Sequence, residues 1–165
     1  METLNIDKEK VINAYKQGSE KEKEVLELLF GVETFRQKTI MDKVKTFDDA
    51  LKELGLGHPF VKEYDCLCNA EISEHLIDYS WLCIITAALN EGWTPKFIEG
   101  ECQYFPYFKV DIKGDLLYAG TGGGSEVVAA NVGCRLAFKT RELAEYAGKQ
   151  FTELYADYLL NTNNA

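Results

Sequence analysis

The chain has 165 residues with a net charge of −9 at pH 7, and 46% of them are hydrophobic, which suffices for one domain with a buried core but not for two. Its longest apolar run, Trp81–Leu89, is shorter than the ~18 residues of a membrane span, and its charged start, Met1–Lys10, is not a signal peptide, so we expect a cytoplasmic protein without membrane contact. Acids are concentrated between Leu56 and Phe108, where the local charge is −6, and because acidic surfaces repel phosphate we expect no nucleic-acid partner.

Residues 1–56 are expected to be the helical N-terminal part of a single domain over residues 1–165. Ser19 and Glu22 have the spacing of a capping box, in which each side chain satisfies a free backbone amide at the start of a helix. Thr46 is a candidate N-cap of a later helix. The apolar spacing predicts helices over Asp7–Gln17, from Ser19 to Gly31 (carrying Val25, Leu28 and Leu29) and over Phe47–Leu54, with Thr34–Lys45 as a connector or a short strand.

Residues 57–160 are expected to hold a long core helix, a sheet and a closing helix, followed by a frayed tail, residues 161–165. The side chains of Val132, Cys134, Leu136 and Phe138 alternate with others along the chain, as in a strand. The predicted elements are a helix from Asn69 or Ser73 to Glu91, strands over Gln103–Ile112, Leu116–Ala119 and Asn131–Lys139, a loop over Gly120–Ala130, and a long amphipathic helix from Thr140.

These elements predict an α+β fold. It comprises N-terminal helices, a small antiparallel three-stranded meander, and a C-terminal amphipathic helix packed on the sheet.

A glycine-rich segment, Gly120–Ser125, is a candidate phosphate-binding loop, because successive glycines can present backbone amides to an anion. The known nucleotide-binding motifs also need a helix directly after the loop and either a Lys-Ser/Thr pair or the G-x-G-x-x-G spacing. Here no lysine follows until Lys139. We therefore interpret the segment as a mobile connection between strands. Its candidate ligand-binding residues are Gly122, Gly123, Gly124 and Ser125.

Cys66, Cys68 and His75 are candidate metal ligands, with Cys83 further along the chain. Structural zinc sites usually pair two knuckles of similar spacing, which this pattern does not provide. We therefore expect no metal and no cofactor. The odd number of cysteines, five, favours free and buried thiols in a reducing cytosol.

A nucleophilic enzyme would need a base beside serine or cysteine, and the chain has two histidines, His58 and His75. His58 precedes a proline in a turn, and His75 is expected to be solvated on an acidic helix. We therefore identify no catalytic residue and favour a protein that is not an enzyme, while leaving catalysis open.

Aromatic residues cluster at Tyr104–Phe108, where they could stack bases on a sheet face. Such platforms come with a basic groove, whereas Glu99 and Glu101 flank this segment. We therefore assign the cluster to core and subunit contacts. Phe105, Tyr107 and Trp93 are the candidate interaction residues, and self-association is an open possibility.

Several segments resemble an uncharacterised family of small proteins from gut Bacteroidales, their phages and their mobile elements. The resemblance rests on Lys45–Ala50, Ala88–Trp93, Tyr104–Phe108, Gly133–Lys139 and Glu142–Ala147, and on the end of the N-terminal helical hairpin at Leu29–Gly31. It implies a bacterial cytoplasm and a phage or mobile-element neighbourhood. It assigns no activity, cofactor or site residue.

The sequence thus favours a non-catalytic protein–protein interaction or assembly protein, of phage or mobile-element type, with an unknown protein partner. One alternative is a small-molecule or nucleotide-binding protein that uses Gly120–Ser125. Another is an acidic nucleic-acid regulator or mimic.

Overall fold

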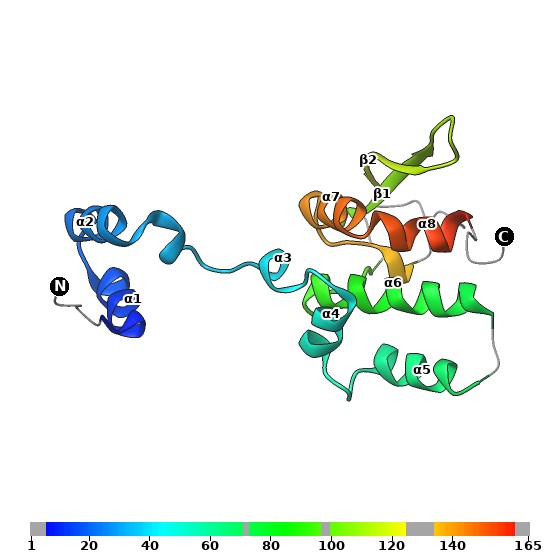
Figure 1. Cartoon of the computed structure of the whole chain (residues 1–165), viewed down its shortest axis with the longest axis horizontal. Coiled ribbons are helices and arrows are strands. Elements are labelled where there is room, and N and C mark those ends of the chain that lie inside the picture. The colour runs from blue at the N-terminus through cyan, green and yellow to red at the C-terminus, as the bar shows by residue number, and fades with distance from the viewer. Residues whose placement is uncertain (1–5, 71–72, 97–99, 125–133, 161–165) are drawn as a thin grey trace. The chain divides into compact units, whose positions relative to one another are not determined.

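The computed structural model describes residues 6–70, 73–96, 100–124 and 134–160. In these ranges the chain forms eight α-helices and one antiparallel sheet of two strands (Figure 1), which confirms the mixed α and β class. None of the described helices is long and apolar enough to cross a membrane. The helices are α1 Lys8–Gln17, α2 Glu20–Phe30, α3 Ile40–Lys43, α4 Phe47–Leu54, α5 Pro59–Cys68, α6 Glu74–Asn90, α7 Arg141–Gln150 and α8 Thr152–Leu160.

The chain divides into two compact units, residues 1–38 and 39–165. The single domain expected over residues 1–165 stays a prediction.

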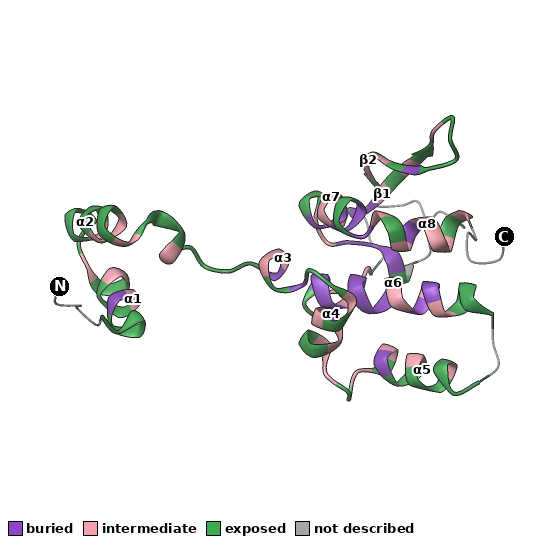
Figure 2. Cartoon of the chain, viewed as in Figure 1, coloured by how far each residue is buried: buried purple, intermediate pink, exposed green. Residues whose placement is uncertain are grey.

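The first unit is a helical hairpin of α1 and α2, as predicted. Asp7 caps α1 by accepting a hydrogen bond from the Glu9 amide at 3.0 Å. The predicted capping box opens α2, where the Ser19 amide donates to the Glu22 carboxylate at 2.7 Å. The two helices bury little. Of their described residues only Val11 is buried, and the rest of the hairpin is exposed or intermediate (Figure 2).

Helix α6 is the core of the second unit, and its predicted position is confirmed. Its middle turns, from Leu82 to Leu89, are almost completely buried (Figure 2). Helices α4 and α5 pack on one side of α6, and α7 and α8 pack on another (Figure 1). This arrangement explains why α6 is apolar nearly all round.

The sheet is a hairpin of β1, Gln103–Val110, and β2, Leu116–Gly124. The Asp111 carboxylate fixes its turn by accepting hydrogen bonds from the amides of Lys113, at 2.7 Å, and Asp115, at 3.0 Å. Helix α7 contacts both strands and α8 contacts β2, so the closing helical segment lies on the sheet as predicted.

The predicted third strand, Asn131–Lys139, is wrong in its described part. Cys134–Leu136 forms a 3-10 turn, and Phe138 makes only an isolated bridge to Tyr104, with backbone hydrogen bonds of 2.9 and 3.0 Å. Leu136, Ala137 and Phe138 are all buried in succession, which a half-exposed strand does not allow. Residues 131–133, like the predicted tail 161–165, lie outside the described residues.

Three helical features also differ from the sequence prediction. Helix α5 was not predicted, because Pro59 was interpreted as part of a turn. In fact Pro59 occupies the first helical position, which proline favours, and His58 caps the helix by accepting from the Phe60 amide at 3.2 Å. The connector over Thr34–Lys45 contains α3 and no strand. The closing helix is two helices, α7 and α8, with Phe151 between them.

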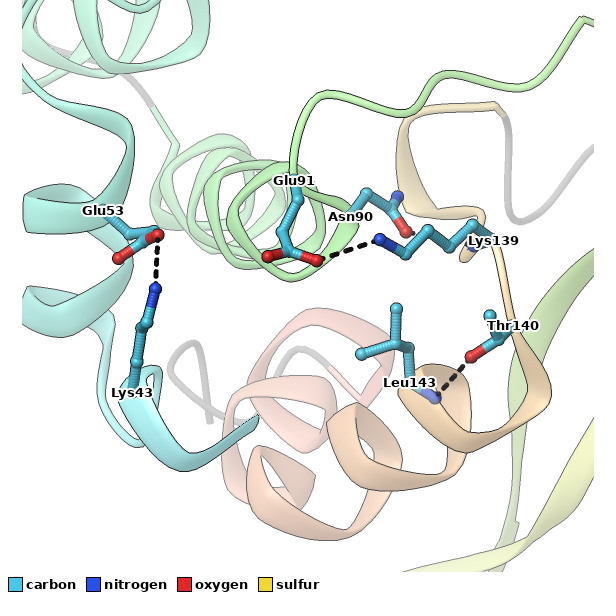
Figure 3. Close-up of polar contacts among 7 residues, drawn as sticks. All are labelled: Lys43, Glu53, Asn90, Glu91, Lys139, Thr140 and Leu143. Atoms are coloured by element: carbon cyan, nitrogen blue, oxygen red, sulfur yellow. Dashed lines mark hydrogen bonds and ion pairs between the residues drawn. The ribbon is translucent and has the colours of Figure 1, made fainter. Parts of the chain in front are cut away.

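A buried asparagine joins the end of α6 to the segment before α7. The Asn90 amide donates to the Ala137 carbonyl at 2.8 Å and accepts from the Lys139 amide at 3.0 Å. Beside it the Lys139 ammonium pairs with Glu91 at 3.0 Å, and Thr140 caps α7 (Figure 3). This junction holds Phe138 between α6 and the hairpin.

Candidate functional site

The glycines of the candidate phosphate loop lie in a strand. Gly120–Gly124 is the second half of β2 and pairs with Gln103–Tyr107 of β1. The expected mobile connection is therefore wrong over these five residues, while Ser125 lies outside the described residues.

Aromatic rings explain two of these glycines, Gly122 and Gly123. A Cβ at Gly122 would stand 2.0 Å from the ring of Tyr107, and one at Gly123 would stand 2.6 Å from the ring of Tyr104. The two rings belong to β1 and lie over these glycines of β2, so any larger residue at either position would collide with a ring. Gly122 and Gly123 thus serve cross-strand packing, of the kind that shields glycine in sheets.

The candidate metal ligands Cys66, Cys68 and His75 do not form a metal-binding group in the described part of the chain. Cys66 and Cys68 are exposed on α5, and His75 on α6 stacks on the ring of Tyr158 with 4.8 Å between centroids. Among the described residues no three His, Cys, Asp or Glu side chains are grouped so that they could hold a metal ion. His75 therefore has an aromatic contact that the sequence did not predict.

Four described cysteines are free, but the prediction that they are buried holds for only one of them. Cys66, Cys68 and Cys102 are exposed, and Cys83 is buried in α6. Burial raises the pKa of Cys83 to about 11, so its sulfur is a thiol at neutral pH and a poor nucleophile. A cavity of about 170 Å³ beside it is bordered by the ion pair of Arg135 and Glu63, 2.9 Å apart.

A buried acid, Asp78, lies on α6 one turn from His75. Burial is the main cause that raises the pKa of Asp78 above its ordinary value, and the negative charges of Asp157 and Glu74 add to the increase. The neighbouring His75 acts in the opposite direction on the pKa of Asp78. The ionised carboxylate therefore costs the folded state free energy.

We expect Asp78→Asn to raise the melting temperature at pH 7 by a few degrees. The pKa of Asp78 is higher in the folded than in the unfolded state, so the protonated carboxyl favours folding. This contribution is complete below the unfolded pKa of about 4 and is lost as the pH rises through the folded pKa. The gain should thus vanish in acid. Thermal unfolding followed by circular dichroism, at pH 7 and below about pH 4, measures this, with Asp65→Asn, an exposed acid on α5, as the control. A lower melting temperature at pH 7 would contradict it.

The three candidate interaction residues differ in exposure. Tyr107 is 56% exposed, whereas Phe105 is buried, so Phe105 offers little surface to a partner. Trp93 is partly buried, and its indole N–H donates to the Glu101 carboxylate at 2.9 Å. Tyr107 is thus the most exposed of the three.

A larger apolar surface lies on the first unit. Val25, Leu28 and Leu29 follow the i, i+3, i+4 spacing of one face of α2, and Val32 begins the 3-10 turn that follows Gly31. These four residues are hereafter the α2 stripe. These side chains are 55, 87, 67 and 62% exposed.

The other side of α2 is occupied by contacts within its own unit. Phe30 packs edge-on against Phe35, and Phe35 stacks on Tyr15 of α1 with 4.1 Å between centroids. The Tyr15 hydroxyl donates to the Glu27 carboxylate. Helix α1 thus covers one face of α2 and leaves the stripe uncovered in this unit.

The sequence reasoning named the apolar residues of α2 but missed that they face outward. The width of the apolar surface of α2 indicates this exposure in the sequence. Leu26 and Phe30 form a second apolar line beside the stripe, and one short helix, α1, cannot cover both lines.

The chain matched no protein-family model, no curated protein and no solved structure.

Proposed function

We propose that this chain is a non-catalytic protein–protein interaction or assembly protein that acts through the α2 stripe. The observation that carries the proposal is the α2 stripe, three aliphatic side chains on one face of α2 and a fourth in the turn after it, each more than half exposed. Burying such a side chain contributes about 1.5–3 kcal/mol, so a partner that covers the row gains substantially. The resemblance to phage and mobile-element proteins supports that setting, in a bacterial cytoplasm.

The size of the first unit supports association. It spans residues 1–38, and chains below about 40 residues usually need a disulfide, a metal or oligomerisation to be stable. The hairpin of α1 and α2 buries only Val11 among its described residues. Covering the α2 stripe would supply the apolar burial that this unit lacks.

We propose a second copy of the chain as the partner. The α2 stripe has no charged or hydrogen-bonding side chain that would select a different protein. The first half of α2 carries charges of both signs, Lys21 and Lys23 with Glu20, Glu22 and Glu24, so a second copy meets no patch of a single sign. A two-fold contact then places the same apolar row on both sides of the interface.

The test is sedimentation velocity of the full chain over a wide range of concentration, at near-neutral pH. We expect the wild type to form a dimer of the 18.7 kDa chain, and Leu28→Glu to remain a monomer at the same concentrations. Ile112→Glu is the matched control, because it places the same charge on an exposed aliphatic position of the second unit. It should dimerise like the wild type.

A monomeric wild type would overturn the second copy as partner. A dimer that persists in Leu28→Glu would place the interface elsewhere and overturn the role of the α2 stripe. Loss of helical circular dichroism in Leu28→Glu is not expected, because the side chain is 87% exposed in the folded chain.

A further inference from the structure

A separate cavity of about 330 Å³ lies within the second unit, between the β hairpin and α8. Its walls are aromatic and aliphatic, with Phe105 and Phe108 from β1, Tyr155 and Tyr158 from α8, and Leu116 and Leu136 beside them. None of the described residues that line it carries a charge.

The mouth of this cavity opens to solvent between Tyr107, Val110 and Leu159, each about half exposed. Since water occupies about 30 Å³, the cavity has room for on the order of ten water-sized groups. That is too little for a helix or a strand, and it lies at the lower end of the roughly 300–1,000 Å³ of small-molecule sites. The volume therefore fits a small molecule better than a segment of protein.

Three tyrosines contribute hydroxyl groups to this lining, and Tyr155 is the most buried of the three. Tyr155 is 5% exposed, its ring lies 4.7 Å from that of Phe108, and burial raises the pKa of its hydroxyl. The hydroxyl is therefore a hydrogen-bond donor at neutral pH. No hydrogen bond between described residues involves it, and it is not among the fully buried polar atoms that lack a partner, so water or a small molecule can reach it.

We infer that the cavity binds a small, neutral aromatic molecule with one hydrogen-bond acceptor, which accepts from the Tyr155 hydroxyl. The aromatic walls favour a ring through edge and face contacts. A charged ligand is disfavoured because the lining offers no opposite charge, and burying an unpaired ion is costly. This site is distinct from the α2 stripe and does not depend on it.

The test compares two probes of nearly identical shape, acetophenone and α-methylstyrene. Acetophenone has a carbonyl oxygen where α-methylstyrene has a methylene group, so only acetophenone can accept a hydrogen bond there. Each is titrated into the full chain while backbone amide resonances are followed by NMR. We expect acetophenone to shift residues around the cavity and to bind roughly two- to tenfold more tightly than α-methylstyrene, the ratio that one hydrogen bond provides. Tyr155→Phe should abolish this preference. Tyr118→Phe, on a hydroxyl that bonds Thr121 at 2.7 Å, should preserve it.

A second variant tests the location without touching Tyr155. Val110→Trp places a large ring at the half-exposed mouth and should remove binding of both probes while the fold is kept. Equal affinity of the wild type for the two probes, a preference that survives Tyr155→Phe, or binding that survives Val110→Trp would each overturn the inference. So would amide shifts confined to residues away from the cavity.

Discussion

Phe138→Ala is expected to lower the free energy of unfolding by about 3–5 kcal/mol, the range for removing a fully buried phenylalanine. The side chain is 0% exposed and belongs to the main hydrophobic cluster of the second unit. Its backbone also binds that of Tyr104 through two hydrogen bonds. The substitution therefore leaves a cavity at the point where α6, the hairpin and the start of α7 meet.

Urea unfolding followed by circular dichroism measures this loss. Ile112→Ala is the control, because it removes an aliphatic side chain from a fully exposed position and should change the free energy by less than about 0.5 kcal/mol. Phe138→Leu should lie between the two. A loss below about 1 kcal/mol in Phe138→Ala would contradict the prediction, because collapse of the surrounding side chains recovers only the cavity part of the cost.

Elements with strong local signals were predictable from the sequence. The capping box of Ser19 and Glu22 marks the start of α2, and Thr46 accepts from the Asp49 amide at 3.2 Å to open α4. In both cases the residues that determine the helix end lie within one turn of it. The apolar run of α6 likewise predicts a buried helix by itself.

Features that depend on distant residues were not predictable in this way. The alternation from Val132 to Phe138 suggests a strand, but Asn90, far along the chain, binds both sides of Phe138 and favours a bent segment instead. In the sequence the glycines of β2 suggest a flexible loop. The role of Gly122 and Gly123 in a strand is not visible there, because it depends on the rings of Tyr107 and Tyr104 on the opposite strand.

The candidate sites follow the same division. The spacing of Val25, Leu28 and Leu29 predicts an apolar helix face, but only the fold shows that α1 covers the other side of α2. The cavity lined by Tyr155 could not be predicted, because the break at Phe151 that starts α8 and the register of the hairpin together create it. Sequence therefore indicates which residues are apolar, and packing decides which of them remain available.

Gly148→Ala is expected to destabilise the chain, although alanine is the better helix former. Gly148 is buried in α7, and a Cβ there would stand 2.7 Å from Pro106 Cβ and 2.7 Å from Tyr118 Cδ2. Helix propensity would gain about 0.5–1 kcal/mol, but overpacking of a core contact costs about 1–3 kcal/mol. The clash should prevail, because the close atoms include a rigid proline ring.

Urea unfolding again gives the measurement, with Gly57→Ala as the control because a Cβ at Gly57 would have no neighbour within 4 Å. A double-mutant cycle locates the strain. If the ring of Tyr118 causes much of the clash, Gly148→Ala should cost less in a Tyr118→Ala background than in the wild type. An increase in stability in Gly148→Ala alone would show instead that the hairpin moves off α7 at little cost. The close approach of α7 to the hairpin would then not determine where that helix lies on the sheet.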